Sequence, residues 1–222
     1  MKCVIVSGGD APGKNDFKKQ LKDAALLIAV DGAADLLDRW GVVPHYIIGD
    51  MDTAADSSLG RLYESGAAAV KLPKEKNETD TQAAVDFALK SGADDIVMLG
   101  ATGGRFDHAM GNVAMLVRAV RAGARCRILD KTNEMWVAAG EHDVCGHPGQ
   151  TVSIIPLTGD LIVTATNLEY PLKNLKLGVD ASRGISNVIL RSPAHLSISG
   201  GYALIVKIRN EKSHFFNARR MI

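Results

Sequence analysis

The sequence predicts an α/β fold with two domains: an N-terminal, mostly parallel sheet with helices, and a C-terminal all-β sandwich. In the first part, short apolar runs alternate with amphipathic helical segments, which is the pattern of parallel strands joined by crossover helices. Near Arg127 this alternation gives way to short β-like runs separated by turn residues. We therefore expect an α/β domain over residues 1-128 and a β-sandwich domain over residues 129-222.

The elements of the first domain follow from local patterns. Apolar runs bounded by turn residues predict strands at 4–6, 26–30, 46–48, 67–72 and 96–99. Apolar residues at helical spacing predict helices at 34–40, 57–64, 83–88 and 109–122. Such an open, Rossmann-like sheet binds its ligands beyond the carboxyl ends of the strands. The residues that follow each strand are therefore the candidates for a functional site.

Composition excludes several classes of partner. Lysine and arginine total 26 and aspartate and glutamate 25, so the basic excess of a nucleic-acid or membrane-surface binder is missing. No apolar run approaches the roughly 18 residues of a membrane span, and the apolar start is too short for a signal peptide. Three cysteines without a C-x-x-C pair fit free thiols in a reducing cytosol. We expect a cytoplasmic protein that acts on small molecules.

Two carboxylates follow the predicted strand at 46–48. Asp50 and Asp52 stand at i and i+2, a spacing that can aim both side chains into one crevice while Met51 turns away. They could hold a hard cation such as Mg²⁺ or serve as an acid/base pair. Alternatively, Asp52 caps the next helix and Asp50 is a turn residue.

Three more strand ends carry similar groups. Asp31 follows the strand at 26–30, Asp80 lies in a polar loop that opens a helix, and Arg105 and Asp107 follow a pair of glycines after residue 99. Helix capping explains any one of them, but not four acidic or phosphate-compatible loops at the same edge of a sheet. Clustered carboxylates repel one another unless cations lie between them, so the array predicts bound Mg²⁺ or Mn²⁺. Metal, arginine and glycine loops together are suited to phosphoryl transfer.

Taken together, these motifs resemble the thiamine pyrophosphokinase (thiamine diphosphokinase) family. The resemblance covers nearly the whole chain, and it rests on the order and spacing of Asp31-Gly-Ala-Ala, Gly49-Asp50-Met51-Asp52-Thr53, Lys74…Thr79-Asp80-Thr81 and Gly103-Gly104-Arg105-Phe106-Asp107-His108…Asn112. ATP-dependent phosphofructokinases are a rival, matched only by the glycine-rich run at 8–13.

The resemblance implies transfer of a pyrophosphoryl group from ATP to the hydroxyl of thiamine, giving thiamine diphosphate and AMP. Asp50, Asp52 and Asp80 would hold Mg²⁺, and together with Arg105 and Asp107 they would form the catalytic set. ATP contacts would come from Asp31, Lys74, Thr79, Arg105, His108 and Asn112. A sensor of nucleotide or thiamine diphosphate that lacks turnover is the alternative from another class of protein.

The second domain carries the implied vitamin site. Its β-like runs are at 135–138, 151–155, 161–164, 184–191, 196–198 and 203–208. Within it, the segments 170–172 and 182–187 resemble the family's thiamine-binding region, and Ser186 and Asn187 match its Ser-Asn pair. A tryptophan that follows this pair in some relatives is replaced here by Val188, Ile189 and Leu190. The resemblance also implies a homodimer, with a partner that covers edge strands of this domain.

One further cluster stands outside these motifs. His142, Cys145 and His147 could be drawn as a zinc site, but their spacing fits no zinc motif, and a chance grouping in a loop is the simpler interpretation.

Overall fold

The structure is a computed structural model of the chain, and it describes residues 1–75 and 77–209. The chain forms two compact units, Met1–Lys131 and Thr132–Ile222. The sixth strand, β6, extends to Leu129, so the boundary expected at 128/129 lies inside a strand. Each unit has its own apolar core, and each is described separately below.

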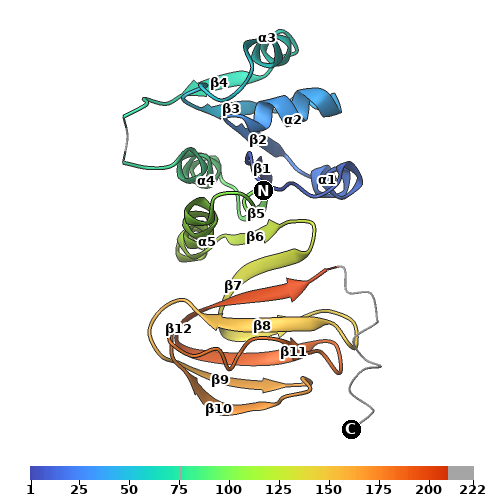
Figure 1. Cartoon of the computed structure of the whole chain (residues 1–222), viewed down its shortest axis with the longest axis vertical. Coiled ribbons are helices and arrows are strands. Elements are labelled where there is room, and N and C mark those ends of the chain that lie inside the picture. The colour runs from blue at the N-terminus through green and yellow to red at the C-terminus, as the bar shows by residue number, and fades with distance from the viewer. Residues whose placement is uncertain (76, 210–222) are drawn as a thin grey trace. The chain divides into compact units, whose positions relative to one another are not determined.

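The first unit is built on a parallel sheet with the strand order β6-β5-β1-β2-β3-β4 (Figure 1). All pairings between neighbours in this order are parallel, as predicted. The inner strands are apolar and buried on both sides, and β2 is buried at every position. The strands are β1 (Lys2–Val6), β2 (Leu26–Val30), β3 (Tyr46–Gly49), β4 (Ala68–Lys71), β5 (Asp95–Leu99) and β6 (Arg125–Leu129).

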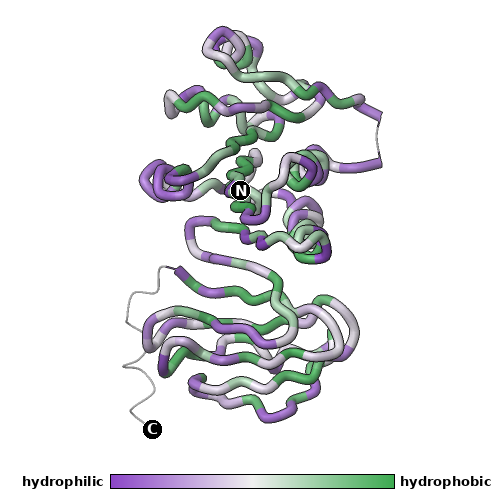
Figure 2. Tube along the Cα trace, turned by 180° about the vertical axis from the view of Figure 1, so that it is seen from behind, coloured by the Kyte–Doolittle hydropathy of each residue, from purple (hydrophilic) through white to green (hydrophobic). Residues whose placement is uncertain are grey.

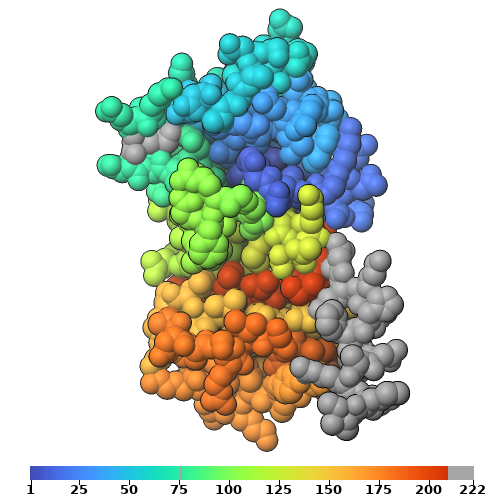
Figure 3. All heavy atoms as spheres, in the orientation of Figure 1, coloured from blue at the N-terminus to red at the C-terminus, as the bar shows by residue number. Residues whose placement is uncertain are grey.

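Helices cover both faces of this sheet. Buried side chains of α1, α2 and α3 share one core with β1, β2 and β3, while α4 and α5 lie on the other face, as Figure 1 shows. In the Cα trace of Figure 2, green apolar residues are frequent along the strands and purple hydrophilic residues along the helices, and Figure 3 shows α5 at the surface of the unit. The helices are α1 (Lys14–Leu21), α2 (Ala33–Trp40), α3 (Asp56–Glu64), α4 (Asp80–Lys90) and α5 (Phe106–Arg121).

Two of these elements have no counterpart in the sequence-based prediction. The helix α1 is strongly polar, and Phe17 is its only fully buried residue, so it lacks a continuous apolar stripe. The ring of Phe17 lies 4.8 Å from that of Trp40 in α2, and this contact holds α1 against the core. The strand β6 alternates charged and apolar residues and lies next to the transition between the two units, where its pattern is easily mistaken for a linker.

The second unit is a β sandwich organised by its last described strand. The first half of β12 pairs with β9, and its second half pairs with β8, while β7 pairs along nearly the whole length. The register shifts between Ile198 and Ala203, where the strand passes from one layer to the other. Apolar residues of β8, β9, β10 and β12 meet in one core. The strands are β7 (Asn133–Val144), β8 (Thr151–Pro156), β9 (Leu161–Thr166), β10 (Leu172–Leu177), β11 (Asn187–Val188) and β12 (Ala194–Ile208).

The prediction for residues 184–191 was wrong in extent. Residues 183–186 form a turn, and β11 contains only Asn187 and Val188. The strand β10 was missed because its exposed lysines and asparagine hide a short apolar alternation. No helix in the described part of the chain is both long and apolar enough to cross a membrane.

Candidate active site

Parallel strands present their following residues at one edge of the sheet. Residues 7–10 follow β1, Asp31 follows β2, Asp50 follows β3 and residues 100–104 follow β5. We call residues 100–104 the glycine loop. The structure therefore brings most of the predicted site residues of the first unit to the edge at which open α/β sheets bind ligands.

Three of the carboxylates converge. Asp31, Asp50 and Asp52 each offer an oxygen within 4.8 Å of those of the other two, and we call this group the carboxylate cluster. Between the last two, Met51 adopts a left-handed backbone with φ 63° and packs against the core. The amide of Asp52 donates a hydrogen bond of 3.2 Å to Oδ1 of Asp50, which closes the turn. The oxygens of Asp50 and Asp52 thus lie close together while Met51 is directed to the core, which is the geometry expected from the i, i+2 spacing.

A glycine makes the cluster possible. A Cβ atom on Gly49 would lie 2.9 Å from Cβ of Asp31 and 3.2 Å from its Cα, so any other residue would collide with the neighbouring strand end. The absence of a side chain at this position lets Asp31 lie against β3. The end of β2 thereby joins the two acids that follow β3.

The side chain of Asp31 is held by Thr53. The Thr53 hydroxyl donates to Oδ2 of Asp31 and accepts a hydrogen bond of 3.1 Å from the amide of Gly32. The second oxygen, Oδ1 of Asp31, is buried without a hydrogen-bond partner among residues 1–75 and 77–209. A buried carboxylate oxygen without a partner is costly, and a bound cation would satisfy it. The donor set of three carboxylates fits a hard cation such as Mg²⁺.

Helix capping does not account for these acids. The N-caps of α2 and α3 are Gly32 and Ala55, and neither helix start receives a side-chain cap bond from its N-cap residue. The amide of Ala55 is instead bound by the carboxylate of Asp35, at 3.1 Å. Neither Asp31 nor Asp52 is therefore the N-cap residue of these helices.

The polar loop before α4 reaches the cluster through one lysine. Nζ of Lys74 lies 3.2 Å from Oδ2 of Asp52, and both side chains are largely exposed. Thr79 is the N-cap of α4, and its hydroxyl accepts a bond of 3.1 Å from the amide of Gln82. Asp80 opens this helix but is not part of the three-membered cluster. The hydroxyls of Thr81 and Ser7 lie 3.4 Å apart, so the start of α4 is next to the end of β1.

Arg105 and Asp107 form an ion pair with each other. Nη2 and Nε of the guanidinium donate to the two carboxylate oxygens at 2.6 Å and 3.2 Å. The Arg105 hydrogen bonds, with help from the amide of His108, lower the pKa of Asp107 to about 2. Both side chains are exposed at the start of α5, as is His108. The pair offers a cation in a fixed orientation at a helix N-terminus, an arrangement that favours anions.

Asn112 does not face the surface. Its side chain is buried, and Nδ2 donates to the carbonyl of Ala101 at 2.8 Å. The residue therefore holds the glycine loop, and its carboxamide points into the protein.

The glycine loop packs tightly against the residues that follow β1. The amide of Gly9 donates to the carbonyl of Gly100 at 2.8 Å, and that of Asp10 donates to the carbonyl of Thr102 at 2.7 Å. A Cβ on Gly9 would lie 2.2 Å from the oxygen of Thr102, so the two loops can touch only because Gly9 lacks a side chain.

In the second unit, Asn187 is a structural residue. It is 5% exposed, and its carboxamide bonds both the amide and the carbonyl of Tyr170, at 3.1 Å and 2.7 Å. Ser186 stands in a left-handed turn with φ 59°, and its amide donates to Oγ of Ser153 at 3.0 Å. The Ser-Asn pair thus links two segments that both resemble the thiamine-binding region, and Tyr170 is 48% exposed.

The grouping of His142, Cys145 and His147 does not form a three-ligand site in the described part of the chain. Nε2 of His142 instead accepts a hydrogen bond of 2.8 Å from the indole of Trp136. Burial lowers the pKa of His142, which keeps the ring in the neutral form that this bond needs.

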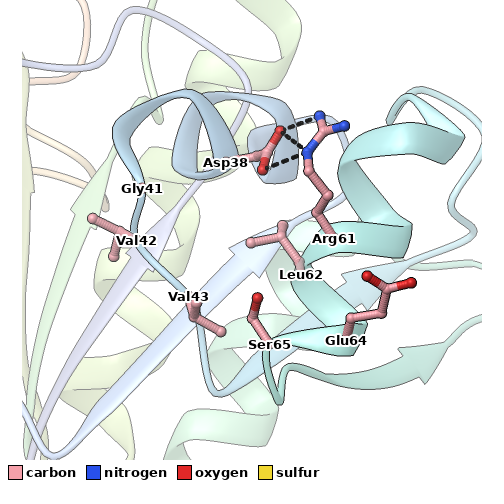
Figure 4. Close-up of a pocket in the computed structure, with 8 residues that line it drawn as sticks. All are labelled: Asp38, Gly41, Val42, Val43, Arg61, Leu62, Glu64 and Ser65. Carbon is pink, nitrogen blue, oxygen red and sulfur yellow. Dashed lines mark hydrogen bonds and ion pairs between the residues drawn. The ribbon is translucent and has the colours of Figure 1, made fainter.

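A hollow elsewhere on the first unit is separate from this site. It has a volume of about 320 Å³ and lies at the C-terminal ends of α2 and α3, where Arg61 pairs with Asp38 at 2.5 Å (Figure 4). In a parallel α/β sheet these helix ends lie at the amino edge of the strands, opposite the cluster. Its lining residues are Asp38, Gly41, Val42, Val43, Arg61, Leu62, Glu64 and Ser65.

Sequence reasoning missed Thr53 as a supporting residue, together with Ser7, Asp35 and Asp130. Thr53 lies three residues after Asp50 and only one after Asp52, and a hydroxyl at that spacing from a cluster of acids was the available signal. Asp130 directly follows β6 and is 7% exposed, but that strand itself was not recognised.

A parallel sheet with clustered carboxylates, an arginine and a glycine loop at its carboxyl edge defines a phosphotransferase of the α/β class. Two family models match the chain: "Thiamin pyrophosphokinase, catalytic domain" over residues 17–128 and "Thiamin pyrophosphokinase, vitamin B1 binding domain" over residues 141–202. The chain belongs to the thiamin pyrophosphokinase family.

Individual relatives agree with this assignment. A thiamine pyrophosphokinase of Bacillus subtilis is 31% identical over 212 residues, which cover 93% of this chain and 99% of the relative. A crystal structure of the B. subtilis protein has a TM-score of 0.86 at 28% identity and covers 95% of this chain and 100% of its own. Thiamin pyrophosphokinase from Candida albicans shares the fold, with a TM-score of 0.83 at 15% identity, and covers 94% of this chain and 89% of its own. The rival resemblance to phosphofructokinases remains confined to residues 8–13.

Proposed function

We propose that this protein transfers a pyrophosphoryl group from ATP to the hydroxyl of thiamine and so forms thiamine diphosphate and AMP. The observation that carries the proposal is the carboxylate cluster, in which one Asp31 oxygen has no hydrogen-bond partner among the described residues, in a chain of this family. Thiamine diphosphate formed in this way requires attack of the hydroxyl on the β-phosphorus, with AMP as the leaving group. Catalysis of such a step is mostly positioning and neutralisation of charge.

Mg²⁺ is the cofactor that the donor set fits. Asp31, Asp50 and Asp52 would hold the ion, and Asp80 would act from the adjacent start of α4. When bound, the ion would neutralise phosphate charge and polarise the P–O bonds of the phosphate that is attacked. The chain's own contribution is to fix the carboxylates: Thr53 holds Asp31, and the turn at Met51 holds Asp50 and Asp52.

Basic residues at the same edge of the sheet would hold the phosphate chain of ATP. Arg105 is oriented by Asp107 and can neutralise phosphate oxygens, and Lys74 is held beside the cluster by Asp52. His108 adds donors at the start of α5, while Thr79 contributes by capping α4. Asp107 would position the guanidinium of Arg105 by its ion pair. Asn112 would act by holding the glycine loop and would not contact ATP.

The thiamine site would be formed by the second unit near Ser186 and Asn187. Because the Asn187 carboxamide is occupied by the backbone of Tyr170, its part would be to fix that segment. The vitamin would then meet the surface that Ser186 and Tyr170 present. An aromatic ring is a suitable surface for a cationic heterocycle, and Tyr170 is the exposed aromatic of this region.

The working form would be a homodimer with the thiamine site completed across the interface. Large apolar side chains are exposed on the segments 170–190 of this small β unit, and exposed apolar surface of this kind is typical of a face covered by a partner. They are Tyr170, Val179, Ile185 and Leu190. Free cysteines and a near-neutral charge support a cytoplasmic location and small-molecule partners, without nucleic acid or membrane.

Turnover distinguishes this proposal from a sensor that only binds its ligands. Purified protein is incubated with ATP, Mg²⁺ and thiamine, and thiamine diphosphate is measured, with Asp50→Asn as the inactive control. We expect product from the unaltered chain and none from the variant. Binding of ATP and thiamine without any product would favour the sensor.

The shared site has its own test. Light scattering at micromolar concentration should give about twice the chain mass of 23.6 kDa. Mixing an Asp50→Asn chain with a Ser186→Ala/Asn187→Ala chain should restore activity if each site draws on both subunits. A fully active monomer would contradict the dimer, and a dimer without complementation would contradict the shared site.

A further inference from the structure

Asp130 lies outside the carboxylate cluster and has no role in the function proposed above. It directly follows β6, is 7% exposed, and accepts a hydrogen bond of 3.0 Å from the hydroxyl of Thr102 through Oδ2. Thr102 is in the middle of the glycine loop, three residues before Arg105. A buried carboxylate is thus bound to the loop that leads to the arginine of the site.

The glycine loop has little conformational preference of its own. Three of its five residues, Gly100, Gly103 and Gly104, have left-handed φ values of 64°, 93° and 62°. Glycine samples many backbone conformations, so a loop of this composition keeps one shape only where other residues hold it.

The holding contacts come from three elements. The side chain of Asn112 on α5 donates to the carbonyl of Ala101, and the amide of Asp10 after β1 donates to the carbonyl of Thr102. Asp130 after β6 binds the Thr102 side chain. Of these three contacts, the one to Asp130 is the only one that depends on a side chain of the loop itself.

From this arrangement we propose that Asp130 is a positioning residue: through the Thr102 hydroxyl it fixes the glycine loop and, with it, the place of Arg105 toward the phosphates of ATP. Asp130 acts only through the loop and touches neither substrate. The inference rests on the proposed use of Arg105 in ATP binding. It predicts that loss of the bond weakens ATP binding and leaves thiamine binding unchanged.

Thr102→Val tests the bond, since valine keeps the shape of threonine and removes the hydroxyl. Thr102→Ser keeps the hydroxyl and serves as the conservative rescue. Thr164→Val is the matched control, because Thr164 in the second unit also donates its hydroxyl, at 3.0 Å, to the side chain of Asn174. Asp130→Ala removes the same bond from the other side and keeps the test valid should Thr102→Val fail to fold.

Michaelis constants for ATP and thiamine are measured for each variant, together with Tm. For Thr102→Val and Asp130→Ala we expect the KM for ATP to rise about tenfold, the size of effect that a misplaced binding group causes. The KM for thiamine should stay the same, and the double variant should be no worse than the more severe single one, since both remove one interaction. Thr102→Ser and Thr164→Val should keep the original KM for ATP.

Two results separate the inference from the function on which it rests. If the unaltered chain makes no thiamine diphosphate, the proposed function fails before any variant is compared. If the unaltered chain is active, and folded Thr102→Val and Asp130→Ala keep its KM for ATP, the positioning role is overturned while the function stands. A lower Tm with an unchanged KM would likewise show that the bond serves stability alone.

Discussion

The hydroxyl of Thr53 donates to Oδ2 of Asp31 and fixes the carboxylate whose other oxygen is buried without a partner in the described residues. Asp31 forms the carboxylate cluster with Asp50 and Asp52, so the bond fixes one member of that cluster. Thr53, to which the sequence analysis assigned no separate role, therefore holds one oxygen of a candidate metal ligand.

Replacing Thr53 by valine should reduce turnover by about 10–100-fold, the usual cost of losing a group that orients a metal ligand. Thr53→Ser keeps the hydroxyl and should retain most of the activity. Initial rates over a Mg²⁺ titration measure the effect, and the deficit should shrink as Mg²⁺ rises. Equal rates for the valine and serine variants would show that the bond has no role in the reaction.

Asp50→Asn and Asp52→Asn should each reduce turnover by several orders of magnitude while the fold stays intact. Asparagine removes a charge that a cation needs but is similar in shape. The Asp52→Asn variant also loses the exposed ion pair with Lys74, which contributes at most about 0–1 kcal/mol to the free energy of unfolding. Rate measurements and thermal unfolding test the two halves of the prediction, and near-normal rates at low Mg²⁺ would refute a metal role.

Mg²⁺ binding has a readout that does not depend on activity. Without nucleotide, saturating Mg²⁺ should raise the Tm of the unaltered chain by something on the order of 5 °C, because an ion that binds only the folded state stabilises it. Asp31→Asn should abolish this rise. Ca²⁺-free buffers and a chelator control exclude other ions. An equal rise in both proteins would place the ion away from Asp31.

Gly49→Ala should destabilise the first unit by about 1–3 kcal/mol and remove activity, because the new Cβ would lie 2.9 Å from Cβ of Asp31. Gly60→Ala is the matched control: Gly60 is in the interior of α3, and an added Cβ there meets nothing within 4 Å. That substitution should be neutral or stabilise by up to about 1 kcal/mol. Denaturant unfolding compares the two, and equal stabilities would contradict the close approach of the strands.

The second unit should lose stability in acid through His142. Its pKa is lowered from 6.5 by burial, so below about pH 6.5 the unfolded chain binds a proton that the folded chain does not. The free energy of unfolding therefore falls as the pH drops through that value, and protonation also breaks the bond from Trp136. His142→Gln cannot titrate, and its Tm should change less between pH 8 and pH 5 than that of the unaltered chain. The same pH dependence in both would contradict the assignment.

The sequence predicted where the candidate site residues lie along the chain better than it predicted which way their side chains point. Strand ends and the Asp50-x-Asp52 spacing located the carboxyl edge, because apolar runs and turn residues are local signals. Which way a side chain points depends on contacts far along the chain. Asn112 and Asn187 look like ligand contacts in the sequence, but both are buried and bound to backbone, at Ala101 and Tyr170.

The membership of the cluster illustrates the same limit. Asp50, Asp52 and Asp80 were expected to hold the metal with help from Asp31, and the structure groups Asp31 with Asp50 and Asp52, because Gly49 has no side chain to keep it away. A missing side chain that permits a contact across two strands leaves no periodic signal in the sequence. The polar helix α1 and the strand β6 were not predicted for a related reason: each has too few apolar residues to form a recognisable pattern.

Chromatography of the nucleotide products is the most direct test of the proposed reaction. The purified protein is incubated with ATP, thiamine and Mg²⁺, and AMP, ADP and thiamine diphosphate are quantified at early times. Attack on the β-phosphorus predicts equal amounts of AMP and thiamine diphosphate, with no ADP beyond that of a reaction lacking enzyme. Stoichiometric ADP with thiamine monophosphate would mean attack on the γ-phosphorus, and would show the protein to be an ordinary kinase.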